Sequence, residues 1–239
     1  MSTVSISGGG AAGRRDASTD ETLVGLPTMT DEELRETMIA AFDLLAHFWS
    51  RPVAEEVERW ETARDIELAM ARHLATGSGG DAGGEDREPV WRPVDVAEMM
   101  ALLDEHERLF VGPGRVPCPP YESFWREDVP VDIRRSLVGP CATDLRRLYL
   151  DLGLELSERS GDLPDHVAVE LEALAYALSL EGTERVARRL YSEHLGSWLP
   201  RLCQAVVQES GHGFYRDLAE LTVAWLAVCA DYFASIDAD

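Results

Sequence analysis

Apolar residues recur every three or four positions over most of the chain, which is the spacing that places them along one face of an α-helix. Residues 30–52, TDEELRETMIAAFDLLAHFWSRP, show this most clearly, with Leu34, Met38 and Phe42 in register. The stretch opens with a Thr-x-x-Glu capping box, and Pro52 ends the pattern. The chain has no sustained alternating run and no Asn-Gly hairpin signal. These features predict an all-α protein.

Further stretches with helical spacing follow, separated by glycine and proline. They are residues 53–75, 94–110, 129–156 with an interruption at Gly139-Pro140, 160–182 with an N-cap at Asp162, 183–210 with a kink at Pro200, and 211–236. Their spacings differ, so no internal repeat is indicated. We predict a single-domain helical bundle of about ten helices over residues 29–236. A disordered acidic and Gly-rich tail is expected at residues 1–28, and a flexible Gly-rich loop at residues 76–89.

The chain is strongly acidic, with 44 Asp and Glu residues against 22 Arg and no Lys, and its formal net charge is −22. Such a surface repels nucleic-acid phosphates and anionic lipids and attracts cationic partners. We therefore expect no binding to nucleic acid or to membranes.

The N-terminal region contains an Arg14-Arg15 pair, but acidic and polar residues follow it where an export signal needs an apolar stretch. The four cysteines lie far apart and form no Cys-x-x-Cys pair, so we expect them to be reduced. These observations predict a cytoplasmic protein, and we expect a monomer.

Residues 105–128, EHERLFVGPGRVPCPPYESFWRED, carry apolar and aromatic side chains on a segment too rich in proline to be a helix or a strand. Its Gly-Pro-Gly corner is no phosphate loop, because Pro113 lacks an N–H and no Lys follows. The segment is either a packed connector or a rigid lip over a binding site. In the second case proline pre-fixes the backbone that presents Tyr121 and Trp125, with acidic residues nearby.

Signatures of catalysis are thin in the sequence. It has no Gly-x-Ser-x-Gly elbow, no phosphate-binding loop and no His-Glu-x-x-His pair. The nearest polar constellation is Asp165-His166 with Glu170 and Glu172, and an acid such as Asp165 is also expected in the first turn of a helix. Dinuclear carboxylate sites use Glu-x-x-His pairs from separate helices, and the sequence does not offer such a set. We predict no enzyme activity, no catalytic residues, no metal ligands and no cofactor.

Four motifs in this order resemble the TorD/DmsD/NarJ family of redox-enzyme maturation chaperones. They are RLFVGPGRVPCPPYESFW, LPDHVAVELEALA, EHLGSWLPRL and GFYRDLAEL. The resemblance covers Asp31 to Phe233. It implies a TorD-like all-helical fold and a cytoplasmic chaperone with no chemical step. Such a chaperone binds the twin-arginine signal peptide, or its remnant, of a molybdopterin oxidoreductase catalytic subunit and holds that subunit until its cofactor is inserted.

The resemblance also implies which residues bind the peptide. They are Trp49, His106, Leu109, Phe110, Pro119, Pro120, Tyr121, Trp125, Asp165 and His166. Two positions depart from the family pattern. His106 stands where an aromatic is common, so a weaker or a pH-sensitive contact is expected there, and Ala173 replaces a bulkier apolar residue.

Structural roles stay open for most of these residues. Leu109 and Phe110 suit a core, residues 119–121 suit a packed turn, and Asp165-His166 suit the start of a helix.

Three other functions also stay open. One is a small helical hydrolase that uses Asp165, His166 and a metal or water. Another is a nucleotide-dependent chaperone with weak guanine-nucleotide binding. The last is a helical scaffold that reads no peptide.

Overall fold

The computed structural model describes residues 29–52, 96–128, 130, 139–155 and 163–236, and the regular secondary structure in these ranges is helical. They hold α1 (Asp31–Trp49), α3 (Val96–His106), α4 (Glu122–Trp125), α6 (Pro140–Asp151), α7 (Val167–Ser179), α8 (Glu184–Arg189), α9 (Gly196–Glu209) and α10 (Gly213–Ile236), together with the π-helical turns η1 (Glu107–Val111) and η2 (Leu190–Leu195). No strand occurs in these ranges. An isolated antiparallel β-bridge pairs Tyr121 with His166. The predicted all-α class is confirmed.

The start of the first helix follows its sequence signal. The Thr30 hydroxyl accepts a hydrogen bond from the Glu33 N–H at 3.2 Å, and the Glu33 carboxylate accepts one from the Thr30 N–H at 2.8 Å. Two of the N–H groups that a helix start leaves unpaired are thereby satisfied. Helix α1 ends at Trp49, three residues before Pro52.

The prediction of a helix N-cap at Asp162 is wrong. Helix α7 begins at Val167, and its N-cap is His166, whose Nδ1 accepts a hydrogen bond from the Ala168 N–H at 3.2 Å. The imidazole takes the role that a shorter Asp or Ser side chain usually has. Helix α6 does begin at Gly139-Pro140, with the proline in its first turn, as its interrupted pattern predicts.

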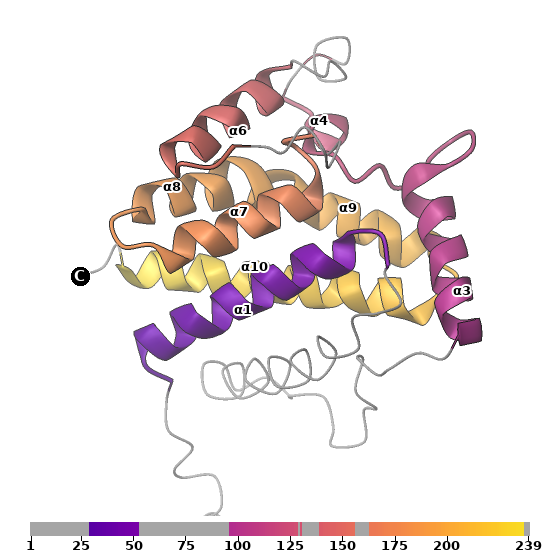
Figure 1. Cartoon of the computed structure of the whole chain (residues 1–239), viewed down its shortest axis with the longest axis horizontal. Coiled ribbons are helices and arrows are strands. Elements are labelled where there is room, and N and C mark those ends of the chain that lie inside the picture. Colours follow the sequence, from indigo (N-terminus) through magenta and orange to yellow (C-terminus); the bar gives the residue numbers. More distant parts are fainter. Residues whose placement is uncertain (1–28, 53–95, 129, 131–138, 156–162, 237–239) are drawn as a thin grey trace, which may run out of the picture.

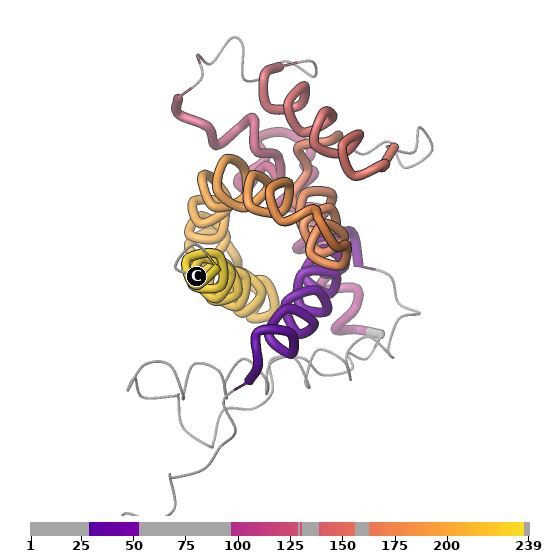
Figure 2. The backbone as a smooth tube through the Cα atoms, turned by 90° about the vertical axis from the view of Figure 1, so that its left-hand side faces the viewer, coloured from indigo at the N-terminus to yellow at the C-terminus, as the bar shows by residue number. Residues whose placement is uncertain are grey.

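The main helices surround one core. Helix α1 packs against α7 and crosses α10, and α6 lies on the far side of α7 from α1 (Figure 1). Viewed nearly end-on, α1, α7, α9 and α10 form a ring (Figure 2). Three tryptophans and a tyrosine are among the largest side chains that are fully buried inside it: Trp49, Trp198, Trp225 and Tyr215.

Helix α10 is long and apolar enough, by length and composition, to cross a membrane. Its buried face includes Tyr215, Leu218, Trp225 and Cys229, which belong to the same core as α1 and α9. A central core helix meets the same test, and the packing of α10 identifies it as one.

Two helices pass directly into π-helical turns. Helix α3 continues into η1, and α8 continues through η2 into α9. A π-turn contains one residue more than an α-helical turn, which changes the direction of the side chains beside it. Gly196 directly follows η2. A Cβ at this position would lie 2.9 Å from the Tyr191 carbonyl oxygen, so only glycine fits without a shift. The kink at Pro200, inside α9, stays a prediction.

The division into a tail at 1–28, a domain at 29–236 and a loop at 76–89 stays a prediction. The tail, the loop and the helix predicted at 53–75 lie outside the described residues.

Candidate functional site

The proline-rich segment is fixed to the helices around it by backbone hydrogen bonds. The Pro119 carbonyl accepts a hydrogen bond from the indole N–H of Trp125 at 2.7 Å. The Pro120 carbonyl accepts one from the Val167 N–H, at the start of α7, at 2.9 Å. Proline carbonyls can accept in this way although the residues have no N–H to give. The segment is therefore a packed connector that holds Trp125 half-buried against the core.

Asp165 and His166 join this connector to α7. The Asp165 carbonyl accepts a hydrogen bond from the Glu122 N–H at 2.8 Å, and its carboxylate accepts one from the Ser123 N–H at 3.2 Å. Tyr121 pairs with His166 in the isolated bridge, and their rings meet edge-on with centroids 5.3 Å apart. Asp165 therefore caps α4 while His166 caps α7, and both polar groups have structural partners.

Trp49, Leu109 and Phe110 lie in the core. Leu109 is fully buried, and Phe110 packs edge-on against Trp49 with ring centroids 5.8 Å apart. The Trp49 indole N–H donates a hydrogen bond to the Thr222 hydroxyl of α10 at 3.0 Å. A buried indole whose N–H has a hydrogen-bond partner contributes to the stability of the bundle. Contact of these three residues with a peptide stays a prediction.

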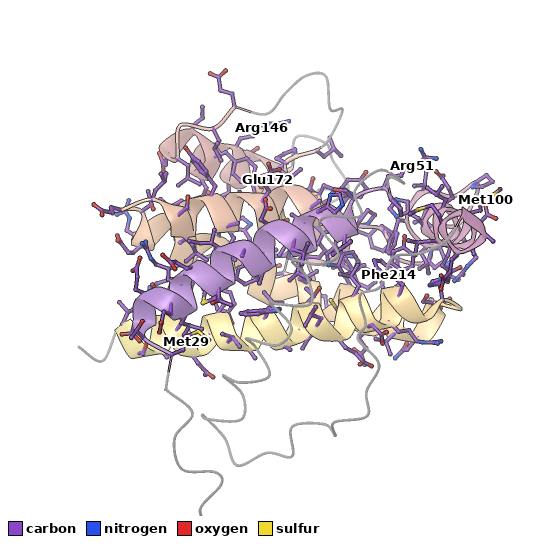
Figure 3. The ribbon with its side chains drawn as sticks, turned by 60° about the horizontal axis from the view of Figure 1, so that its bottom comes forward. Met29, Arg51, Met100, Arg146, Glu172 and Phe214 are labelled. Carbon is purple, nitrogen blue, oxygen red and sulfur yellow. The ribbon has the colours of Figure 1, made fainter. Side chains whose placement is uncertain are left out.

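A cavity beside the end of α1 collects three of the residues that the sequence predicts. This cavity, here called the His166 pocket, has a volume of about 530 Å³. Trp49, His106 and His166 line it, and so do Asp43, Ala46, His47, Ser50, Arg51, Val111, Ala168, Val169 and Glu172. Figure 3 labels Arg51, beyond the end of α1, and Glu172, on α7.

His106 is buried in the wall of this pocket and contacts the rings of Phe110 and Tyr215. Burial lowers the pKa of His106 to about 4, because the surrounding apolar groups disfavour the charged imidazolium. Its Nδ1 has no hydrogen-bond partner among the described residues. The imidazole is therefore neutral at neutral pH, and a charge change at this contact is restricted to acid conditions.

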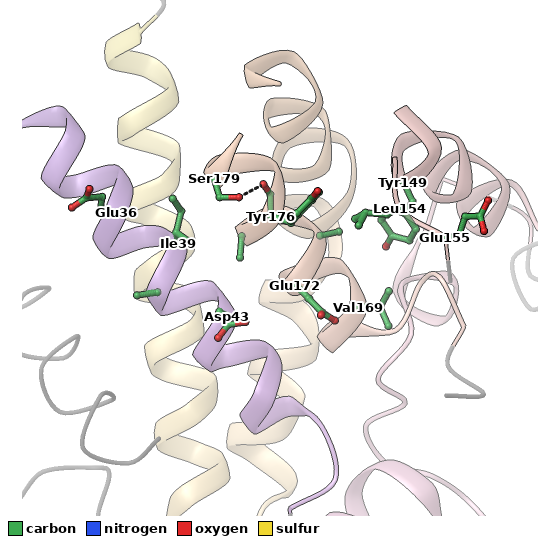
Figure 4. Close-up of a pocket in the computed structure, with 13 residues that line it drawn as sticks. Glu36, Ile39, Asp43, Tyr149, Leu154, Glu155, Val169, Glu172, Tyr176 and Ser179 are labelled. Atoms are coloured by element: carbon green, nitrogen blue, oxygen red, sulfur yellow. Dashed lines mark hydrogen bonds between the residues drawn. The ribbon is translucent and has the colours of Figure 1, made fainter. Parts of the chain in front are cut away.

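A larger hollow runs between α1 and α7 and reaches the end of α6. It is here called the α1–α7 groove, and its volume is about 650 Å³. The apolar part of its lining is Ile39, Ala40, Leu154, Val169, Ala173 and Ala175, with Tyr149 and Tyr176 beside them. Figure 4 shows Ile39 on α1 and Val169 and Tyr176 on α7 around this space.

Four acidic side chains line the same groove: Glu36, Asp43, Glu155 and Glu172. No Lys or Arg occurs among its described lining residues. Asp43, Val169 and Glu172 also line the His166 pocket, so the two hollows adjoin along α1 and α7. Together they offer an apolar surface bordered by carboxylates, which suits an extended or helical segment that is both cationic and apolar.

Sequence reasoning missed most of this groove. Glu36, Ile39, Ala40 and Asp43 follow one another at intervals of three, one and three along α1, beside the face that the apolar stripe buries. That spacing was a usable signal for a second face. It could not predict the other wall of the groove, because Tyr176 and the end of α6 are far away in the sequence.

Comparisons with known proteins agree with this architecture. The nitrate reductase delta subunit family matches residues 93–204. The Tat proofreading chaperone DmsD of Salmonella typhi is 31% identical over 155 residues, which are 60% of this chain and 72% of that protein. The chaperone protein TorD of Shewanella loihica is 24% identical over 135 residues, which are 56% of this chain and 63% of TorD.

One solved structure has a similar fold. It is the crystal structure of a protein from Archaeoglobus fulgidus that is provisionally named a redox enzyme maturation protein. Its TM-score with this chain is 0.51 at 22% identity, and the match covers 85% of this chain and 97% of that one. At this identity the likeness establishes the fold alone.

Proposed function

The chain belongs to the TorD/DmsD/NarJ family of redox-enzyme maturation chaperones, and from this premise we propose how it recognises its client. It binds the twin-arginine signal peptide, or the remnant of one, of a molybdopterin oxidoreductase catalytic subunit. It holds that subunit in the cytoplasm until the cofactor is inserted, and it performs no chemical step. The observation that carries the proposal is the α1–α7 groove, with its apolar floor and four carboxylates.

The chemistry of the groove complements that of a twin-arginine signal. Such a signal presents two guanidinium groups followed by an apolar helix-forming stretch. Guanidinium groups form strong charge-assisted hydrogen bonds with carboxylates such as Asp43 and Glu172. The apolar stretch gains by removing surface from water against Ile39, Ala40 and Val169. We assign the arginines to the shared border of the two hollows and the apolar stretch to the groove.

The hydrolase alternative has less support. Asp165 accepts a hydrogen bond from the Ser123 N–H, and His166 accepts one from the Ala168 N–H. A general base in the same place needs a free lone pair that faces a substrate. Capping roles account for both side chains.

The test is isothermal titration of the purified chain with the signal peptide of a molybdenum enzyme encoded beside it. A twin-Lys version of the peptide serves as its control, because lysine keeps the charge and loses the bidentate geometry. We expect tighter binding of the twin-arginine peptide.

Two variants locate the site. Ala40→Trp fills the groove and is expected to weaken binding at least tenfold, whereas Ala227→Trp, at an exposed position of α10, leaves it unchanged. Glu172→Gln removes a carboxylate from the shared border, with Asp231→Asn on α10 as its control. Binding that is unaffected by both groove variants would move the site elsewhere, and no binding of the peptide by the folded chain would refute signal-peptide recognition.

A further inference from the structure

Three polar side chains from three separate elements meet inside the protein. Glu122 belongs to α4, Glu170 to α7 and His194 to η2. Their relative exposures are 0%, 0% and 2%. One ligand atom from each lies within 4.8 Å of the corresponding atoms of the other two. From this geometry we propose that Glu122, Glu170 and His194 bind one divalent transition-metal ion of the Zn²⁺ class.

The carboxylates are held from outside the cluster. Arg126 donates a hydrogen bond to Glu122 Oε1 at 2.6 Å, and the Trp198 indole N–H donates one to Glu170 Oε2 at 3.2 Å. The remaining oxygen of Glu122, Oε2, lies 2.8 Å from His194 Nδ1. The remaining oxygen of Glu170, Oε1, is buried and has no hydrogen-bond partner among the described residues. An unpartnered buried carboxylate oxygen is costly, and a cation beside it removes that cost.

The histidine is held in the same manner. His194 Nε2 lies 3.2 Å from Asp144 Oδ2, while Nδ1 faces Glu122. A carboxylate on one ring nitrogen and a metal on the other is the usual arrangement of a ligating histidine, because the carboxylate fixes the ring and raises its basicity. His194 lies in the π-turn η2, which Gly196 closes.

The donor set selects the kind of ion. One imidazole and two carboxylates, with no thiolate, suit Zn²⁺ and similar borderline or hard divalent ions. Two carboxylates neutralise the charge of such an ion, so a buried site becomes neutral as a whole. The charge of Arg126 is shared with Asp128, whose Oδ1 accepts a hydrogen bond from Arg126 Nε at 2.6 Å. Three protein ligands leave a fourth position for water.

The site escapes sequence reasoning because its ligands are 48 and 24 residues apart along the chain, from Glu122 to Glu170 and from Glu170 to His194. No ligand motif joins residues at such spacings. The proposal is independent of peptide recognition, since metal content is measured on the chaperone alone.

The test uses the full untagged chain, stripped with EDTA and shown by circular dichroism to be folded. We titrate it with Zn²⁺, dialyse it, and measure the bound metal by mass spectrometry. We expect one equivalent and a rise in melting temperature, because a ligand that binds only the folded state stabilises it. Co²⁺ serves as an optical probe and is expected to show ligand-field bands without thiolate charge transfer.

Three variants separate this site from others. Glu170→Gln keeps the size of the side chain, removes its charge, and is expected to abolish stoichiometric binding. Asp144→Asn is expected to weaken binding about 10- to 100-fold, since it changes the group behind His194, which also accepts a hydrogen bond from Arg189, and removes no ligand. Glu172→Gln, on the exposed face of the same helix, is expected to bind as the wild type does.

Two results overturn the proposal. One is a folded wild-type chain that retains no more metal than Glu170→Gln after loading with Zn²⁺. The other is a Glu170→Gln variant that binds the ion as tightly as the wild type. The first result would leave the cluster without a metal, and the second would place the bound ion elsewhere on the chain.

Discussion

Trp49 shows how one side chain can suit two roles until its partners are known. The family resemblance assigns it to peptide binding, and it does lie in the wall of the His166 pocket. Its relative exposure is nevertheless 1%, and its indole N–H is bonded to Thr222. The Thr222 hydroxyl in turn donates a hydrogen bond to the Leu218 carbonyl at 2.7 Å. This chain of bonds joins the end of α1 to α10.

Thr222→Val is expected to destabilise the protein although it keeps the volume of the side chain. The substitution leaves the Trp49 N–H buried without an acceptor, which costs about 1–3 kcal/mol. The free energy of unfolding is measured by urea denaturation. Thr222→Ser keeps the hydroxyl and loses only a methyl group, worth about 1 kcal/mol. A Thr222→Val protein as stable as the wild type would show that this bond contributes nothing.

At the scale of elements, the end of α3 is attached to the turn between α9 and α10 through one carboxylate. Glu105 Oε1 accepts hydrogen bonds from the Gly211 N–H at 2.7 Å and from the Ser210 hydroxyl at 3.0 Å. Glu105 Oε2 accepts one from Arg108 at 2.7 Å. The bond from Arg108 is the largest cause that lowers the pKa of Glu105 to about 2, and the bonds from Gly211 and Ser210 add to it. This contact orients α3 and the π-turn η1, and with them His106.

The pH dependence of stability follows from the lowered pKa of Glu105. A carboxyl whose folded-state pKa lies below its unfolded value stabilises the protein above the unfolded value, about 4.5, and loses this effect as pH falls towards 2. Glu105→Gln is expected to lower the free energy of unfolding by about 1–2 kcal/mol at pH 7, a value reduced for solvent screening. The difference from wild type should shrink below pH 4.5. Asp104→Asn, exposed on the same helix, is the control. A constant difference between pH 7 and pH 3 would contradict this account.

At the scale of the whole molecule, the net charge of −22 and the acidic groove act on the same ligand at different distances. The overall field raises the rate at which a cationic peptide arrives, and salt screens it over about 10 Å at 0.1 M. Carboxylates in contact with the arginines add affinity that salt also weakens. Apolar contacts in the groove respond little to moderate salt.

The two groove variants should therefore differ in their response to salt. Glu172→Gln is expected to weaken peptide binding several-fold at low ionic strength and to approach wild type as salt rises. Ala40→Trp should weaken binding by a similar factor at all ionic strengths. Titrations at increasing NaCl concentration measure both. Parallel salt curves for the two variants would contradict the division between a charged border and an apolar floor.

Local sequence determined the helices themselves. The capping box at Thr30 and Glu33, and the Gly139-Pro140 start of α6, were predictable because each depends on residues within one helical turn. The failure at Asp162 has a local reason too: His166 caps α7 with an imidazole, which capping rules rank low. Membership of the family was also predictable, since four motifs in a fixed order carry the resemblance.

Tertiary structure alone decided which face of each helix meets which partner. Periodicity states that a face is apolar and does not say what covers it. By sequence alone Leu109 and Phe110 suit either peptide contact or the core. The packing of Phe110 on Trp49 places both residues in the core, and their contact with a peptide stays a prediction. The α1–α7 groove needs side chains from α1, α7 and the end of α6. The cluster of Glu122, Glu170 and His194 needs α4, α7 and η2. Contacts between distant segments arise only when the chain closes on its core, and no local pattern encodes them.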